Sequence, residues 1–168
     1  LVLLGVLLFS SGVWAQTNDR DLAELYFNKQ EYDKAQLYFE KLYNANPNSY
    51  YYQKYLDCLL KTEQFEEAEK LVKKEIKNSQ NPSIPYIDLG KVYQKQGEPK
   101  KADKAFENAL DNLPASQGFI NLIGRKFTDL GLYDWAEQVY AKGKQLLNNA
   151  YPFSMELANL HGARGNTE

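Results

Sequence analysis

The chain has 168 residues and a formal net charge of −2, from 20 basic and 22 acidic side chains. This balance leaves no cationic field for nucleic acid, and a hydrophobic content of 43% excludes a disordered chain. The chain has one Cys and one His. These are too few for an internal disulfide framework or a Cys/His zinc site, and they exclude a catalytic Cys–His or Ser–His pair with a second His beside it. We therefore expect a packed core, with no cofactor, no metal and no nucleic-acid partner.

An apolar run occupies residues 1–9, and the small or aliphatic side chains of Val13 and Ala15 follow it. This order predicts a partial secretory signal over residues 1–15, cut between Ala15 and Gln16. The protein would then be exported, to the periplasm or the cell envelope. An uncleaved N-terminal anchor is the alternative. Because neither a Met nor a basic segment precedes the run, we expect the sequence to begin inside its own signal.

A repeat of 33 or 34 residues runs through the rest of the chain. Its clearest marker is an alanine, followed four residues later by a large aromatic or aliphatic residue. Upstream, a large residue stands beside a small one, and another large residue follows three positions on. The alanines are Ala35, Ala68, Ala102 and Ala136, and a fifth copy begins at Leu157, Ala158 and His161. Such a period is typical of stacked structural units.

The spacing within a unit predicts two antiparallel helices joined by a tight turn. In the third unit, Leu89, Gly90 and Tyr93 lie on one helical stripe, and the alanine column begins a second stripe. Between them, Gly97 suits the end of a helix and Pro99 suits the first turn of the next. Candidate N-caps precede the first helices at Asn48, Ser83 and Ser116.

The third unit shows a family pattern in full. It reads Tyr86, Leu89-Gly90, Tyr93, Ala102, Phe106 and Pro114. This order resembles the tetratricopeptide repeat. The resemblance covers residues 17–168 and implies an all-α fold, a right-handed α-solenoid in which antiparallel helix pairs stack into a superhelix. It gives four full units and part of a fifth, at residues 17–48, 49–82, 83–116, 117–150 and 151–168. We expect the natural protein to continue with more repeats.

The resemblance also implies a binding surface. In that family the inner face of each first helix lines a concave groove that binds peptides or partner segments. The matching positions here are Arg20, Glu24, Tyr50, Gln53, Asp57, Ile84, Ile87, Lys91, Lys95, Asn121 and Arg125. Acidic groups in the early units and basic groups in the later ones would orient a charged peptide; ordinary surface charge is the alternative. Apolar bulk at Tyr50, Ile84 and Ile87 indicates a contact surface; packing against an adjacent turn is the alternative.

The sequence lacks the common enzyme motifs, since it has no Gly-rich phosphate loop, H-E-x-x-H or G-x-S-x-G. His161 falls in a core column, so we expect it to pack. Glu69 and Lys73 are expected to form a solvated ion pair. The chain is thus predicted to be a non-enzymatic scaffold for a protein or peptide partner, with no small-molecule substrate evident and self-association left open. The alternatives are the non-catalytic arm of a larger envelope enzyme or secretion machine and, less favoured, a glycan- or cell-wall-binding module.

Overall fold

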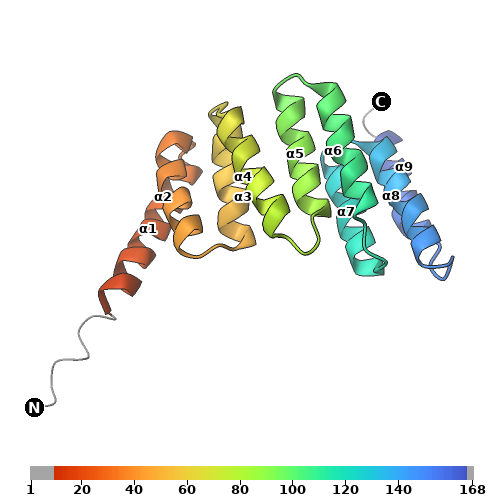
Figure 1. Ribbon diagram of the computed structural model, residues 1–168, viewed down its shortest axis with the longest axis horizontal. Helices are drawn as coiled ribbons and strands as arrows, with labels where there is room; N and C mark the ends of the chain where they lie inside the picture. Colours follow the sequence, from red (N-terminus) through yellow and green to blue (C-terminus); the bar gives the residue numbers. More distant parts are fainter. Residues whose placement is uncertain (1–9, 166–168) are drawn as a thin grey trace, which may run out of the picture. The chain divides into compact units, whose positions relative to one another are not determined.

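The described part of the chain contains nine α-helices and no strand (Figure 1). The computed structural model describes the backbone of residues 10–165 and the side chains of residues 18–165. The apolar run of the predicted signal lies outside the described residues, and the predicted cleavage position after Ala15 lies within the first helix. None of the helices in the described range is long and apolar enough to cross a membrane. The all-α fold predicted from the sequence is confirmed.

Short links join the helices. The first four are α1 (Ser10–Asn28), α2 (Tyr32–Ala45), α3 (Ser49–Lys61) and α4 (Phe65–Asn78). They are followed by α5 (Ser83–Lys95), α6 (Pro99–Asp111), α7 (Gln117–Asp129), α8 (Tyr133–Leu146) and α9 (Ser154–Gly165).

The chain divides into two compact units, one ending at Ala68 and the other beginning at Glu69. In the first unit α1 packs against α2, and α2 packs against α3. In the second unit α5 pairs with α6, and α7 pairs with α8. Helix α9 packs against α8, and α7 contacts both α5 and α9. The pairs α1/α2, α5/α6 and α7/α8 are antiparallel hairpins (Figure 1).

The repeat columns form the core, as the sequence predicts. All four alanines of the alanine column are at most 1% exposed. The large residues four positions later are Phe39, Val72, Phe106 and Tyr140, and each is buried. Burial of apolar area at this repeating spacing is the main contribution to the stability of each unit.

Small residues in the first helices let the paired helices approach closely. A Cβ atom at Gly90 would overlap the ring of Phe106 in α6, and one at Gly124 would overlap the ring of Tyr140 in α8. Each aromatic ring therefore fills the volume that a side chain on the first helix would need. The same small-to-large match recurs in two successive hairpins, which explains the sequence column.

The turns after the first helices use the left-handed backbone conformation. The φ angle is +74° at Gly97 and +71° at Gly131, and it is +62° at Gln30 and +57° at Glu63. The N–H groups of Gly97 and Glu98 donate to carbonyl oxygens in the last turn of α5, which is a Schellman motif. Gly97 thus ends its helix as predicted, whereas Gln30 and Glu63 carry a steric cost that glycine avoids.

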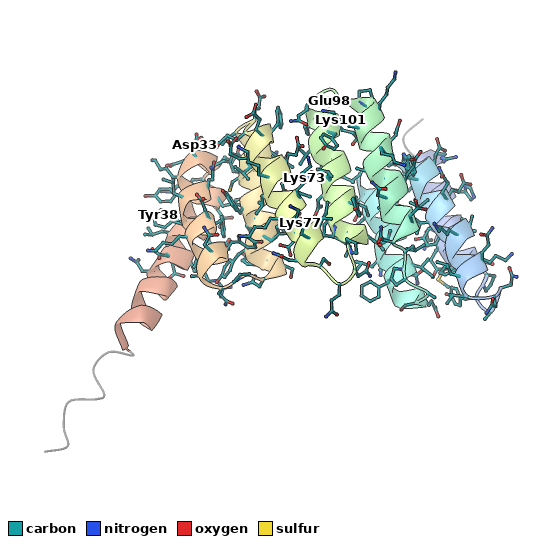
Figure 2. The ribbon with its side chains drawn as sticks, in the orientation of Figure 1. Asp33, Tyr38, Lys73, Lys77, Glu98 and Lys101 are labelled. Carbon is teal, nitrogen blue, oxygen red and sulfur yellow. The ribbon has the colours of Figure 1, made fainter. Side chains whose placement is uncertain are left out.

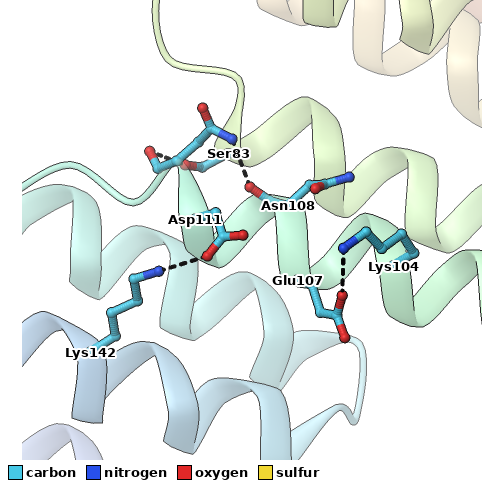
Figure 3. Close-up of polar contacts among 7 residues, drawn as sticks. Ser83, Lys104, Glu107, Asn108, Asp111 and Lys142 are labelled. Carbon is cyan, nitrogen blue, oxygen red and sulfur yellow. Dashed lines mark hydrogen bonds and ion pairs between the residues drawn. The ribbon is translucent and has the colours of Figure 1, made fainter.

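Side-chain hydrogen bonds fix the ends of several helices. Asn48 caps α3 as predicted, because its Oδ1 accepts from the N–H of Tyr51 at 3.0 Å. The prediction is wrong at Ser83, which is the first residue of α5 and whose hydroxyl donates to the main-chain oxygen of Asn112 at 2.7 Å. Lys142 of α8 pairs with Asp111 at 3.0 Å (Figure 3). The C-terminal end of α6 is therefore tied to both α5 and α8.

Candidate partner-binding faces

The predicted binding residues lie on the first helices of the hairpins. Helices α1 and α3 carry the set of the first unit, which is Arg20, Glu24, Tyr50, Gln53 and Asp57. Helices α5 and α7 carry the set of the second unit, which is Ile84, Ile87, Lys91, Lys95, Asn121 and Arg125. These two sets are called here the first-helix faces of the two units.

Tyr50 is the centre of the first-helix face in the first unit. Its hydroxyl donates a hydrogen bond to the carboxylate of Glu24, and the guanidinium of Arg20 lies 5.9 Å from its ring centroid. The ammonium of Lys54 lies 5.9 Å from the same centroid and 3.7 Å from the ring centroid of Phe27. The structure therefore brings three predicted residues together and adds Lys54, which sequence reasoning missed.

The charge of this face is mixed. Arg20 and Lys54 lie beside Glu24, so the carboxylate does not give the cluster an acidic character. Desolvation of the Tyr50 hydroxyl, followed by its bond to Glu24, raises the pKa of Tyr50 to about 12. The hydroxyl thus remains a donor at neutral pH, while Tyr50 as a whole is 43% exposed. Gln53 and Asp57 are half-buried further along α3.

Ile87 does not belong to an exposed face. It is 1% exposed, because α5 buries residues around most of its circumference. The prediction that Ile87 adds apolar bulk to a binding surface is therefore wrong, and Ile87 is a core residue. Ile84 and Lys91 are half-buried, and Lys95 is exposed. The accessible part of this face is smaller than the sequence pattern suggests.

Asn121 and Arg125 line a pocket of about 290 Å³ between α7 and α9. Tyr140 and Leu160, both buried, also line it. The remaining lining residues are Thr128 from α7 and Met155, Glu156 and Asn159 from α9. The pocket lies wholly within the second unit and combines one carboxylate, one guanidinium and two amides with apolar side chains.

Hydrogen bonds hold the carboxylate of Glu156 in place. Asn121 donates through Nδ2 to Glu156 Oε1 at 2.9 Å, and the hydroxyl of Tyr151 donates to the same oxygen at 3.1 Å. The other carboxylate oxygen, Glu156 Oε2, is buried without a partner, and so is Asn121 Oδ1. Arg125 donates through Nε to the main-chain oxygen of Asn121 at 3.3 Å. Two oxygen atoms beside the pocket thus have no hydrogen-bond partner among the described residues.

Both charged groups of the pocket affect the pKa of Tyr140. Burial is the main cause that raises the pKa of Tyr140. The nearby carboxylate of Glu156 raises this pKa further, whereas the guanidinium of Arg125 opposes the rise. A negative and a positive group therefore act on one hydroxyl from within the same pocket.

The residues of α9 were not among the predicted site residues, although the repeat contained a signal for two of them. Adding one repeat length of 34 residues to Asn121 and Arg125 gives Met155 and Asn159, which line the same pocket. Glu156 falls outside the predicted groove columns, so periodicity alone gives no signal for it.

His161 is exposed, not packed. Its side chain is 57% exposed and its Nε2 lies 3.7 Å from Glu137. The prediction of a packing role is therefore wrong, because the imidazole lies at the surface beside Glu137 of α8. Within the side chains that the structure describes, no three His, Cys, Asp or Glu residues gather as a metal site.

Basic residues of the second helices form ion pairs. Lys73 pairs with Glu69 at 2.5 Å, as predicted. Lys101 pairs with Glu98 (Figure 2). Its ammonium also lies 5.4 Å from the ring centroid of Tyr93. These pairs satisfy charges on a solvated surface and leave the first-helix faces as the better candidates for binding.

Sequence comparison decides the family. The profile of the TT21 fifth ARM repeats domain matches residues 20–124 of this chain. The chain belongs to this family. The matched range includes parts of both units and ends within α7. No curated protein sequence matches the chain significantly.

Two solved structures are similar to this chain. A tetratricopeptide repeat protein from Parabacteroides merdae is 18% identical, with a TM-score of 0.50, over 91% of this chain and 61% of that protein. MamA from Desulfovibrio magneticus RS-1 is 18% identical, with a TM-score of 0.47, over 80% of this chain and 77% of that protein. The likeness to the Parabacteroides protein shows a tetratricopeptide-like helical repeat fold, as the resemblance in sequence implies.

Proposed function

We propose that the protein is a non-enzymatic scaffold that binds a protein or peptide partner along its first-helix faces. The proposal rests on a difference between the first helices and the second helices of the hairpins. The first-helix faces expose an aromatic ring at Tyr50 and hold a pocket with two unsatisfied acceptors. On the second helices, by comparison, several exposed lysines form ion pairs with nearby glutamates, as Lys73, Lys101 and Lys104 do.

An exposed aromatic ring with neighbouring charged groups is typical of protein-binding surfaces. Tyr50 offers apolar area at a low entropic cost, and Arg20 and Lys54 beside it offer donors. The pocket between α7 and α9 offers a second contact point with acceptors and donors in separate places. A partner segment that reaches such points gains specificity from the polar groups and affinity from the apolar ones.

Site-specific photo-cross-linking tests this proposal. A benzophenone amino acid is placed at Tyr50, at Met155 or, as a control, at Leu37, which is 65% exposed on the second helix α2. We expect discrete adducts from positions 50 and 155 in cells that make the protein, and none from position 37. Adducts of equal abundance from Leu37 would contradict binding along the first-helix faces, and so would their absence from both face positions.

Export to the periplasm or cell envelope is a second part of the proposal, supported by the apolar run and the small residues before Gln16. N-terminal sequencing of the protein from an envelope fraction tests it. The mature chain is expected to begin at Gln16. A chain recovered in the cytoplasm with residues before Gln16 intact would refute both export and cleavage.

A further inference from the structure

The pocket between α7 and α9 has an inner region of acceptors and a cationic rim. Its inner side chains, Asn121 and Glu156, are half-buried and each has an oxygen with no hydrogen-bond partner. Arg125 is exposed, so water screens its charge. The two unsatisfied acceptors therefore belong to the half-buried part of the pocket lining, and the positive charge belongs to its exposed part.

The carboxylate of Glu156 lacks a cationic partner among the described residues. Both of its hydrogen bonds come from neutral donors, the amide of Asn121 and the hydroxyl of Tyr151. A half-buried carboxylate with an unsatisfied oxygen is unfavourable, and a cation that donates to it removes that cost. Both oxygens are covered in the structure, so a ligand reaches them only when the terminal torsions of Glu156 and Asn121, which are soft, turn them toward the cavity.

We propose that this pocket takes the guanidinium group of an arginine side chain from a partner protein, with Glu156 Oε2 and Asn121 Oδ1 as its acceptors. This inference rests on the proposed function and names the chemistry of the partner. A guanidinium presents several donors in one plane, so one group reaches both acceptors and makes a charge-assisted bond to the carboxylate.

The size of the pocket and the side chains that line it fit an arginine side chain. A pocket of about 290 Å³ is at the lower limit for drug-sized molecules and suits a single side chain. Apolar contact from Met155 and Leu160 matches the methylene stem of an arginine. Arg125 is exposed, so water screens its repulsion of an incoming guanidinium.

A titration with a capped amino acid tests the proposal directly. The probe is Nα-acetyl-arginine methylamide, and its control is the neutral isostere Nα-acetyl-citrulline methylamide. Binding is followed by the backbone and Asn side-chain amide shifts of the protein in NMR spectra. We expect saturable shifts in α7 and α9 with the arginine probe at roughly millimolar affinity, and binding at least about tenfold weaker for the citrulline probe.

Three variants locate the effect. Glu156→Gln keeps an acceptor for Asn121 and Tyr151 but removes the charge, and we expect it to weaken binding at least about tenfold. Arg125→Gln is expected to bind the probe as well as the wild type or more tightly, because it removes a like charge. Glu107→Gln, in an exposed pair with Lys104, is the matched control and leaves binding unchanged. Circular dichroism confirms that each variant is folded.

Three results would overturn the inference: no saturable shift with the arginine probe, equal binding of citrulline, or a loss in Arg125→Gln but not in Glu156→Gln. The last result would indicate an anion site. The photo-cross-links at Tyr50 and Met155 separate the two proposals. If these adducts form while the probe fails, the scaffold stands and the arginine pocket does not.

Discussion

The close approach of α5 and α6 gives the sharpest prediction of the packing. Gly90 faces the ring of Phe106, which is fully buried and also lies 5.4 Å from Phe127 and 5.5 Å from Trp135, centroid to centroid. In Gly90→Ala, the new methyl group overlaps this ring. The ring has little room to move, because aromatic neighbours surround it.

Two opposing effects set the magnitude. Replacement of glycine by alanine inside a helix stabilises it by about 1 kcal/mol. Overpacking in a filled core costs about 1–3 kcal/mol and more where the backbone must shift. The overlap with Phe106 is deep, so we expect Gly90→Ala to lower the free energy of unfolding by about 1–2 kcal/mol. Gly118→Ala, where a Cβ meets nothing within 4 Å, is expected to be neutral or slightly stabilising.

Urea unfolding followed by circular dichroism measures both variants. A second change checks the cause. Phe106→Leu removes part of the ring, and in the background of Gly90→Ala we expect it to recover about 1 kcal/mol, although alone it destabilises. The reasoning is refuted if Gly90→Ala is as stable as Gly118→Ala, or if the double variant is simply the sum of the two single ones.

Three further outcomes are expected. Gln30→Gly relieves a left-handed backbone, so we expect it to raise the free energy of unfolding by about 0.5–1 kcal/mol and the thermal midpoint with it. A lower midpoint would contradict this. The bond to Lys73 holds the pKa of Glu69 below its ordinary value of 4.5. The ionised Glu69 therefore stabilises the folded protein above pH 4.5, and this contribution is lost as pH falls through the lowered pKa. The stability difference between wild type and Glu69→Gln should therefore shrink in acid, and a constant difference would refute the linkage. Cys58 is fully buried and burial raises its pKa to about 12, so thiol reagents should label it only on unfolding; rapid labelling of the folded protein would refute this.

Much of the fold was predictable because the repeat places the same contact in the same column. The alanine column and the large residues four positions after it are buried in all four copies that contain them, as their spacing requires. Glycine in the left-handed region marks the end of a first helix at Gly97. The equivalent turns at Gln30 and Glu63 have no such marker, since these residues tolerate the conformation only at a cost.

The candidate site was less predictable, because exposure depends on neighbours that a single repeat does not encode. Ile87 and Asn121 share a column, yet Ile87 is buried in α5 and Asn121 lines a pocket. Glu156 lines the pocket only because α9 packs against α7. Carboxylates are common on helices, so the sequence does not distinguish Glu156 from the others. Only the three-dimensional structure shows that one of its oxygens has no hydrogen-bond partner.

Hydrogen–deuterium exchange with a partner recovered by cross-linking tests the central claim most directly. We expect slower exchange in the first helices α7 and α9 when the partner is bound, with exchange in α6 unchanged. Protection confined to α6, with no change in α7 and α9, would contradict binding along the first-helix faces.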